Sequence, residues 1–365
     1  MDAAPTPRST PLPQVHGYTP DGFIAAAREL VPRGFGAARD LYKQVVLEGR
    51  CEPESLGLSA EACAHYRAAF RFELPSVAHT VSEEGDTGTT AKAVLRLEDG
   101  YEVECVLIPM GRDKHTLCVS SQVGCKMGCT FCETARMGLL RHLRPDEIVG
   151  QLLVARHVLG WDFKNVVFMG MGEALDNPSL FHVLRLLNDP SGMSIAQECL
   201  TVCTVGSVDG INSLRDAGFT RLNLSVSLNS ADDSTRSRIM PVNRKHALAE
   251  LQAALVAYRP RRNFALGVNY CLMPGLNDSR EDAARVAAFC APIARTLVNV
   301  IPYNPGNAPL TRAPSEDEVD AFIGWLREEG LAVRRRVTKG RSVMAACGQL
   351  GNVELRRGKS LPVTR

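Results

Sequence analysis

The stretch TLCVSSQVGCKMGCTFC, residues 116–132, decides the fold of this chain. Its first six residues are typical of a buried β-strand, and the loop that follows places Cys125, Cys129 and Cys132 at the spacing C-x3-C-x2-C. Thiolates are favoured ligands of iron–sulfur clusters and of structural zinc. Structural zinc needs four protein ligands, and the nearest candidates for a fourth, His115 and His142, lie outside the loop. A four-iron cluster held by three cysteines instead keeps one iron open. The loop therefore predicts an iron–sulfur cluster, with zinc or three unrelated cysteines as alternatives.

A strand–helix alternation extends from this stretch toward the C-terminus. The strand candidates are 116–121, 165–170, 199–204, 222–227, 265–271 and 297–302, with 331–337 as a possible seventh. Helical stretches are expected near 145–159, 178–187, 207–217, 231–239, 247–258, 278–293 and 315–329. Parallel strands need such crossovers, so the pattern predicts an α/β fold, a partial (β/α)6 TIM-like barrel with its chemistry at the C-terminal ends of the strands.

The remaining segments suggest a small helical region before the barrel. We expect a disordered, proline-rich leader over 1–19, a helical accessory domain over 20–75, and a polar linker with a β-hairpin around Asp99-Gly100 over 76–110. The barrel then covers 111–345, and residues 346–365 form a C-terminal segment with a basic tail.

Composition excludes several classes of protein. The 365 residues carry 42 basic and 40 acidic side chains, and 45% are hydrophobic, which is ordinary for a globular chain and unlike a disordered one. Twelve cysteines in a chain of this length do not suggest a disulfide scaffold, and no signal peptide or transmembrane run is evident. We therefore expect a cytoplasmic protein whose cysteines are core residues, metal ligands or catalytic thiols.

Five motifs, in order, resemble one enzyme family. The cysteine loop, with Phe131 before its last cysteine, is similar to the radical S-adenosylmethionine (SAM) signature. The wider motifs resemble the RlmN/Cfr ribosomal RNA methyltransferases, and they are TLCVSSQVGC (116–125), GMGEALDN (170–177), MPVN (240–243), IPYNP (301–305) and ACGQL (346–350). The resemblance implies that Cys125, Cys129 and Cys132 bind a [4Fe–4S] cluster whose open iron holds SAM. Reduction then yields a 5′-deoxyadenosyl radical.

The same resemblance assigns the SAM contacts. Gly172 and Glu173 follow a strand, and Glu173 would accept a hydrogen bond from the SAM amine. The other matching positions are Cys203, Ser227, Leu228, Asn229 and Asn304. The chain departs from the family at two of them, because the family usually has Ser at the position of Cys203 and His at that of Asn229.

Three further residues match the family's catalytic positions. Cys347 would be methylated by one SAM and lose a hydrogen atom to the radical made from a second, so that its methylene carbon attacks the adenine. Cys118 would resolve the adduct by forming a disulfide with Cys347. Glu104 matches the proton acceptor, with Glu102 as a weaker candidate for that position.

Basic residues gather near Cys347. Residues 327–365 hold ten Lys or Arg against three Glu, and Arg141, His142 and Arg144 follow the cysteine loop, which suits phosphate contacts. The resemblance implies methylation at C2 of adenosine 2503 in 23S ribosomal RNA, with transfer RNA as a second substrate and an electron donor such as flavodoxin or ferredoxin. The alternatives are C8 methylation, a radical SAM enzyme with a non-RNA substrate, and a non-enzymatic cluster protein. We expect a monomer without membrane contact.

Overall fold

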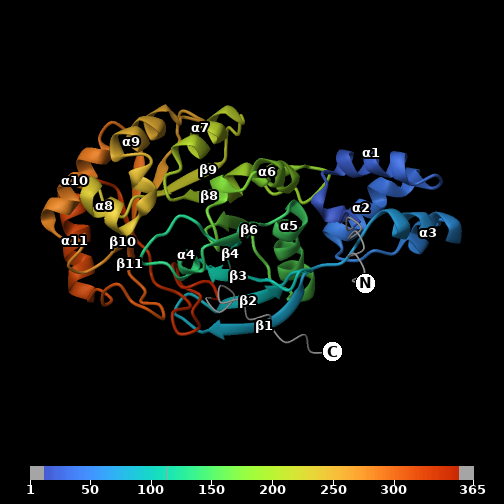
Figure 1. Ribbon diagram of the computed structural model, residues 1–365, viewed down its shortest axis with the longest axis horizontal. Coiled ribbons are helices and arrows are strands. Elements are labelled where there is room, and N and C mark those ends of the chain that lie inside the picture. The colour runs from blue at the N-terminus through green and yellow to red at the C-terminus, as the bar shows by residue number, and fades with distance from the viewer. Residues whose placement is uncertain (1–11, 113, 353–365) are drawn as a thin grey trace, which may run out of the picture.

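The core of the molecule is one ten-stranded sheet in the order β1-β2-β3-β4-β7-β8-β9-β10-β11-β12 (Figure 1). The computed structural model describes residues 12–112 and 114–352. The strands from β4 onward are parallel, and they are β4 (His115–Cys118), β7 (Asn165–Phe168), β8 (Leu200–Thr204), β9 (Asn223–Ser227), β10 (Leu266–Leu272), β11 (Thr296–Pro302) and β12 (Val333–Arg335). The predicted partial barrel is confirmed, and the seventh strand is present as β12.

Helices connect the parallel strands and cover the outer face of the sheet (Figure 1). They are α5 (Pro145–Leu153), which continues as a π-helical turn (Val154–Val158), α6 (Leu180–Asn188), α7 (Val208–Asp216), α8 (Asp233–Ile239), α9 (Leu248–Ala257), α10 (Arg280–Cys290) and α11 (Glu316–Glu328). Side-chain caps fix several starts, for example Ser315, which accepts from the backbone N–H of Glu318 while the carboxylate of Glu318 accepts from the N–H of Ser315. Each predicted helix is present, with ends shifted by a few residues.

Alternate residues of the parallel strands face opposite sides. The outer side is apolar and fully buried, and it includes Leu117, Val166, Val202, Leu224, Val268 and Val298. The inner side is mostly polar, and it includes Cys118, Cys203, Ser225, Ser227, Asn269 and Asn299. The barrel thus has an apolar outer wall and a polar inner wall.

Three antiparallel strands extend the sheet at β4. They are β1 (Ser76–Glu83), β2 (Thr90–Arg96) and β3 (Glu102–Pro109), and the turn between β2 and β3 contains Asp99-Gly100 as predicted. The prediction of a linker for residues 76–83 was wrong. These residues form an edge strand with one face toward solvent, and such a strand has the polar composition of a linker.

The N-terminal region is helical, as predicted. It consists of α1 (Pro20–Leu30), α2 (Ala38–Leu47) and α3 (Ala60–Ala69), at one end of the molecule (Figure 1). The predicted leader lies partly outside the described residues, and its described part is ordered. Val15 is fully buried, and its N–H donates to the carbonyl of Arg71 at 3.1 Å. None of the helices in the described ranges is both long and apolar enough to cross a bilayer.

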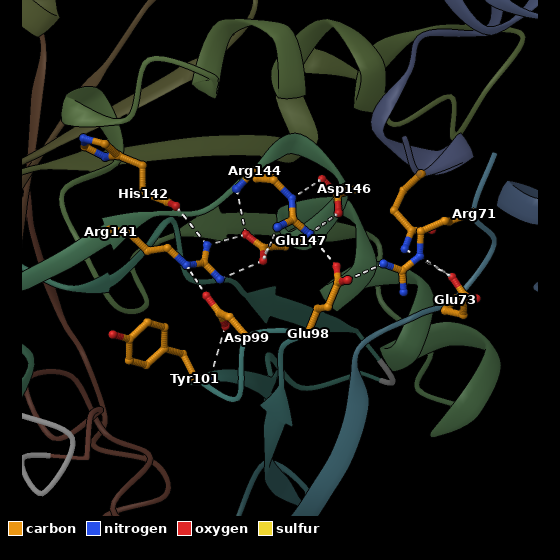
Figure 2. Close-up of polar contacts among 11 residues, drawn as sticks. Arg71, Glu73, Glu98, Asp99, Tyr101, Arg141, His142, Arg144, Asp146 and Glu147 are labelled. Carbon is orange, nitrogen blue, oxygen red and sulfur yellow. Dashed lines mark hydrogen bonds and ion pairs between the residues drawn. The ribbon is translucent and has the colours of Figure 1, made fainter. Parts of the chain in front are cut away.

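An ion-pair network joins this region to the barrel (Figure 2). Arg141 lies between Asp99 of the β2–β3 turn (2.6 Å) and Glu147 of α5 (2.7 Å). Arg71, which follows α3, pairs with Glu98 of the same turn. The network continues through Glu73, Arg144 and Asp146. Helical region, hairpin and barrel therefore meet at one charged junction.

Candidate active site

The cysteine loop leaves the sheet after β5 (Gln122–Gly124), which pairs with β6 (Leu139–His142) around the short helix α4 (Glu133–Met137). Gly124 has φ +74°, and a Cβ there would lie 1.8 Å from the carbonyl oxygen of Gly138, so this position requires glycine. Cys125 and Cys129 are buried, Cys132 is half-buried, and all three thiols are free. Burial raises the pKa of the Cys125 thiol to about 12, so its proton would leave when iron binds.

The donor set fits a cluster better than a single ion. No group of three His, Cys, Asp or Glu side chains within residues 12–112 and 114–352 is arranged to hold one metal ion. Structural zinc would require thiolates converging at about 2.3 Å on one centre. In a four-iron cluster each thiolate binds a different iron, so the ligands need not converge on one point. The three loop cysteines are thus positioned to hold a cluster, with the adjoining cavity left for a further ligand.

That cavity is bordered by Glu173 at the end of β7. The Glu173 carboxylate accepts from the N–H of Val205 at 2.8 Å and from that of Leu175 at 3.3 Å, and burial raises its pKa to about 7. Gly172 has φ +101°, and a Cβ there would approach the Gln122 side chain to 2.6 Å. The glycine therefore allows Gln122 to accept from the Glu173 N–H at 2.9 Å.

The other predicted SAM contacts lie at the ends of neighbouring strands. Cys203, Ser227 and Asn229 line the same cavity. Asn229 has φ +56°, which asparagine tolerates, and its side-chain oxygen accepts from the Cys271 N–H at 2.8 Å. The Oδ1 atom of Asn304 is buried and without a partner in the described structure.

Leu228 occupies a different position from these residues. Its side chain is fully buried in the core, and it is not among the residues that line the cavity. Both of its backbone groups are already bonded, the N–H to the carbonyl of Asn269 and the carbonyl to Arg236. The predicted contact between Leu228 and SAM is therefore not prepared in this structure.

Cys118 and Cys347 lie at one cavity, although more than 200 residues separate them in the sequence. Cys118 is buried on the inner face of β4, whereas Cys347 is exposed, with its sulfur 3.8 Å from the Met169 sulfur. Burial, and then the neighbouring thiols of Cys347 and Cys203, raise the pKa of Cys118. The structure thus places the predicted redox pair on either side of a common space.

Cys347 is carried by residues 340–351, which we call the closing segment because several of its residues line the cavity that also contains Cys118. Ala345 and Leu350 of the segment pack into the hydrophobic core. Hydrogen bonds also hold it: Gly340 and Ser342 N–H to Glu83, Lys92 to the Met344 carbonyl, Glu133 N–H to the Gly348 carbonyl, Thr134 to the Leu350 carbonyl, and Gln349 to the Pro305 carbonyl. Cys347 is therefore positioned by both the antiparallel extension and the cysteine loop.

Glu104 reaches the same segment from β3. Its carboxylate accepts from the Gly351 N–H at 3.2 Å and lies 3.5 Å from the ammonium of Lys92. Burial raises the Glu104 pKa, and Lys92 opposes that shift. Glu102 instead pairs with Arg96 at 2.9 Å, away from the closing segment. The geometry favours Glu104 over Glu102 as a base near Cys347.

Sequence reasoning missed Arg236, which is 1% exposed. Its guanidinium donates to carbonyls at the ends of β8 and β9, namely Val205 (2.6 Å) and Leu228 (3.0 Å), and to Asn243 of the MPVN motif (2.8 Å). Burial lowers the pKa of Arg236 to about 10. The motif thus helps to hold the two strand ends that border the cavity.

The remaining cysteines were predicted to be core residues. Cys63, Cys105 and Cys290 are buried, and Cys51 and Cys199 pack partly buried against the core. The prediction was wrong for Cys271, which lines the cavity with Cys129 and Cys132. It lies on the inner face of β10, and the sequence does not show which face of a doubly buried strand faces the site.

The basic residues have different environments. Arg141 and Arg144 are engaged in the charged junction, and Arg335 pairs with Glu316 and Asp320 of α11, so each of the three has acidic partners in this structure. Their contact with phosphate stays a prediction. Arg334 and Arg336 line the cavity of Cys118 and Cys347. The predicted basic tail, with Arg356, Arg357, Lys359 and Arg365, lies outside the described residues.

Comparisons with known proteins agree with this site. Residues 119–287 match the model of the Radical SAM superfamily. A protein of Protochlamydia amoebophila, named probable dual-specificity RNA methyltransferase RlmN 1, is 40% identical over 288 residues, which are 78% of this chain and 80% of that protein. A probable RNA methyltransferase of Sorangium cellulosum is 40% identical over 95% of this chain and 90% of its own length.

A solved structure has the same fold. The crystal structure of a radical SAM methyltransferase from Sphaerobacter thermophilus aligns with a TM-score of 0.85 and 30% identity, over 93% of this chain and 99% of that one. Fold, cysteine loop and full-length similarity thus agree. The chain belongs to the RlmN family of radical SAM RNA methyltransferases.

Proposed function

We propose that this enzyme methylates a ring carbon of adenine in RNA through a methylated Cys347, and that its target is C2 of adenosine 2503 in 23S ribosomal RNA, with transfer RNA as a second substrate. The supporting observation is the placement of Cys347 across from Cys118, in a cavity that shares Cys132, Met169 and Cys203 with the cavity beside the cysteine loop. Relatives named dual-specificity RNA methyltransferase agree with an RNA substrate. We expect a cytoplasmic monomer.

Bound at the cysteine loop, a [4Fe–4S] cluster with SAM would supply a methyl group and a hydrogen-abstracting 5′-deoxyadenosyl radical, at a cost of two SAM per turnover. Cys125, Cys129 and Cys132 would hold the cluster. SAM would be surrounded by Gly172, Glu173, Cys203, Ser227, Asn229 and Asn304. Leu228, directly after β9, would contribute through the backbone that positions Ser227 and Asn229. The buried carboxylate of Glu173 is suited to an ammonium group, since a charged partner would offset its burial.

Cys347 carries the methyl group in this proposal. Its thiol loses a proton when the S–CH3 bond forms, and the methyl then loses one hydrogen atom. The resulting carbon bonds to the adenine ring and links the RNA to the Cys347 sulfur. Glu104 takes the ring proton, and the oxidised form of an electron carrier such as flavodoxin or ferredoxin accepts the one electron that leaves the adduct. The target base must be unstacked to reach this cavity.

Cys118 releases the product. Its thiolate attacks the Cys347 sulfur, and the sulfur–carbon bond breaks with its electron pair on the carbon, which takes up a proton to become the product methyl group. A disulfide between Cys118 and Cys347 remains. Two electrons and two protons from a donor such as flavodoxin or ferredoxin then restore both thiols.

The test compares three cysteine variants of the anaerobically reconstituted enzyme with SAM, dithionite and RNA. Cys118→Ala should accumulate RNA joined covalently to protein, because the adduct forms but is not resolved. Cys347→Ala should give neither adduct nor methylated base. Cys199→Ala, a thiol away from the cavity, should behave as wild type. Methyl transfer by Cys347→Ala at the wild-type rate would show the mechanism to be wrong.

The position of methylation needs a separate measurement. Mass spectrometry of nucleosides, with 2-methyl- and 8-methyladenosine as standards, should find the 2-methyl isomer. The 8-methyl isomer would replace C2 by C8 in the proposal. Formation of 5′-deoxyadenosine without any RNA methylation would favour a non-RNA substrate.

A further inference from the structure

Two asparagines lie side by side on the inner wall of the barrel. Asn269 of β10 and Asn299 of β11 are register partners, and the Asn299 amide donates to the Asn269 side-chain oxygen at 3.1 Å. They are 2% and 4% exposed. Within the described residues, the Asn269 Nδ2 and Asn299 Oδ1 atoms have no hydrogen-bond partner. Buried polar groups are seldom left unpaired, so these two atoms point to a ligand.

The free atoms form a donor–acceptor pair. If both amides were rotated by 180°, the Asn269 amide would donate to Asn299, and one donor and one acceptor would again remain free. A phosphate would require donors only, and a cation acceptors only. The pair therefore suits a planar group that offers one acceptor beside one donor.

The pair lies where the two cavities meet. Asn269 borders the cavity of the cysteine loop, and Asn299 borders that of Cys118 and Cys347. Gly267, two residues before Asn269, has no side chain on this face, and a Cβ there would lie 2.5 Å from the Ser225 hydroxyl. That hydroxyl is also buried, and it has no hydrogen-bond partner in the part of the chain that the structure describes. The glycine keeps open a space beside the pair.

We propose that Asn269 and Asn299 together hydrogen-bond the amine edge of an adenine ring, which offers its N6 amine beside a ring nitrogen. The inference rests on the proposed function and deepens it, because SAM and the target nucleotide both carry adenine. The shared chemistry is the amine edge, and the two sources are distinguished by experiment.

The test uses reconstituted enzyme and two pairs of ligands. One pair is SAM and its analogue whose purine lacks the N6 amine. The other is an RNA hairpin with the target adenosine and the same hairpin with purine riboside at that position. For each pair the ratio of dissociation constants measures recognition of the amine edge. Wild type should favour adenine about tenfold to hundredfold in one of the pairs.

Asn269→Leu and Asn299→Leu should each bring that ratio close to one. A loss in the SAM pair assigns the edge to SAM, and a loss in the RNA pair assigns it to the substrate base. The control is Asn223→Leu on the inner face of β9, because its amide already bonds the Glu198 carbonyl (2.8 Å) and Arg261 (3.1 Å). It should leave the ratio unchanged.

Ratios unchanged in both pairs for both variants, or no preference for adenine in wild type, would overturn the inference. If a Leu variant fails to bind iron, Asn269→Ala and Asn299→Ala replace the Leu pair. Wild-type RNA methylation is measured first. Its absence would count against the proposed function alone, since the SAM pair still decides the role of the asparagines.

Discussion

The two walls of the barrel sheet differ although the same strands form both. On the outer wall, residues such as Val202, Leu224 and Val268 are fully buried under the helices. On the inner wall, Ser225 and Asn269 alternate with them and carry buried atoms that have no hydrogen-bond partner among the described residues. Burying an unpaired polar group costs stability, whereas burying an aliphatic side chain gains it. The outer wall therefore stabilises the fold, and the inner wall carries the polar groups that we assign to ligand binding.

The largest expected effect is on the rate of methyl transfer. It tests whether Glu104, on β3, acts in the reaction together with the residues of the inner wall. Glu104→Gln keeps an acceptor for the Gly351 N–H but removes the base, so the rate of methyl transfer should fall about 1,000-fold. Single-turnover kinetics measure it. The control is Glu102→Gln, on the same strand and paired with Arg96, which should stay within about twofold of wild type. A large loss in the control with little loss in Glu104→Gln would reverse the assignment of the base.

The next largest effect is on the free energy of unfolding, compared for two adjacent residues on opposite walls. Leu224→Ala should lower the free energy of unfolding by about 3 kcal/mol, because it opens a cavity under the helices. Ser225→Ala should leave that free energy nearly unchanged, since the Ser225 hydroxyl has no hydrogen-bond partner to lose within residues 12–112 and 114–352. Denaturant unfolding of both variants measures the difference. Equal losses would mean that the walls do not differ in what they contribute to stability.

A smaller effect concerns stability away from both walls. His16 is buried at the charged junction near Asp146, Arg144 and Glu73, and burial lowers its pKa to about 4. In the unfolded chain His16 binds a proton more readily than in the folded protein. The contribution of neutral His16 to the free energy of unfolding is therefore full above about pH 6.5 and is lost as the pH falls toward 4. Between pH 7 and pH 5 it should fall by about 2 kcal/mol. Denaturant unfolding at several pH values measures this, and in His16→Gln the fall between pH 7 and pH 5 should be absent. A variant with the same pH profile as wild type would contradict the prediction.

The smallest effect concerns Arg336, which lines the cavity of Cys347. Although Cys347 is exposed, the protein atoms around its sulfur displace water and so raise the pKa of the thiol, and Arg336 opposes that shift. Arg336→Gln should therefore slow alkylation of Cys347 by iodoacetamide about tenfold at neutral pH, which equals one unit of pKa. Arg336→Lys should retain most of the wild-type rate. Mass spectrometry of the peptide that contains Cys347 follows the reaction.

Much of the barrel follows from the sequence because its outer wall repeats in every strand. The cysteine loop is predictable for a similar reason, since its ligands are close in sequence. Asn269 and Asn299 were missed because their contact depends on the register between β10 and β11. A strand buried on both faces does not reveal which face lines a cavity.

Contacts between distant segments were also beyond sequence reasoning. The proximity of Cys118 and Cys347 was expected only from family resemblance, because the closing segment brings them together from opposite ends of the barrel. Lys92, which holds the Met344 carbonyl and neighbours Glu104, carries no local signal. The ion pairs of Arg141 were not evident from the sequence either, because its partners, Asp99 and Glu147, lie in other elements.

The closing segment has a consequence for hydrogen exchange. Residues 340–351 bury only three apolar side chains, those of Ala345, Ala346 and Leu350. They are otherwise held by hydrogen bonds to Glu83, Lys92, Glu133, Thr134 and the Pro305 carbonyl, while the strands behind them are fixed by the apolar outer wall. The Gly351 amide, for example, is bonded to the Glu104 carboxylate. Amides of this kind should exchange hydrogen by local opening far faster than the amides of β9. A bulky base and a disulfide partner could then reach Cys347 without unfolding of the barrel.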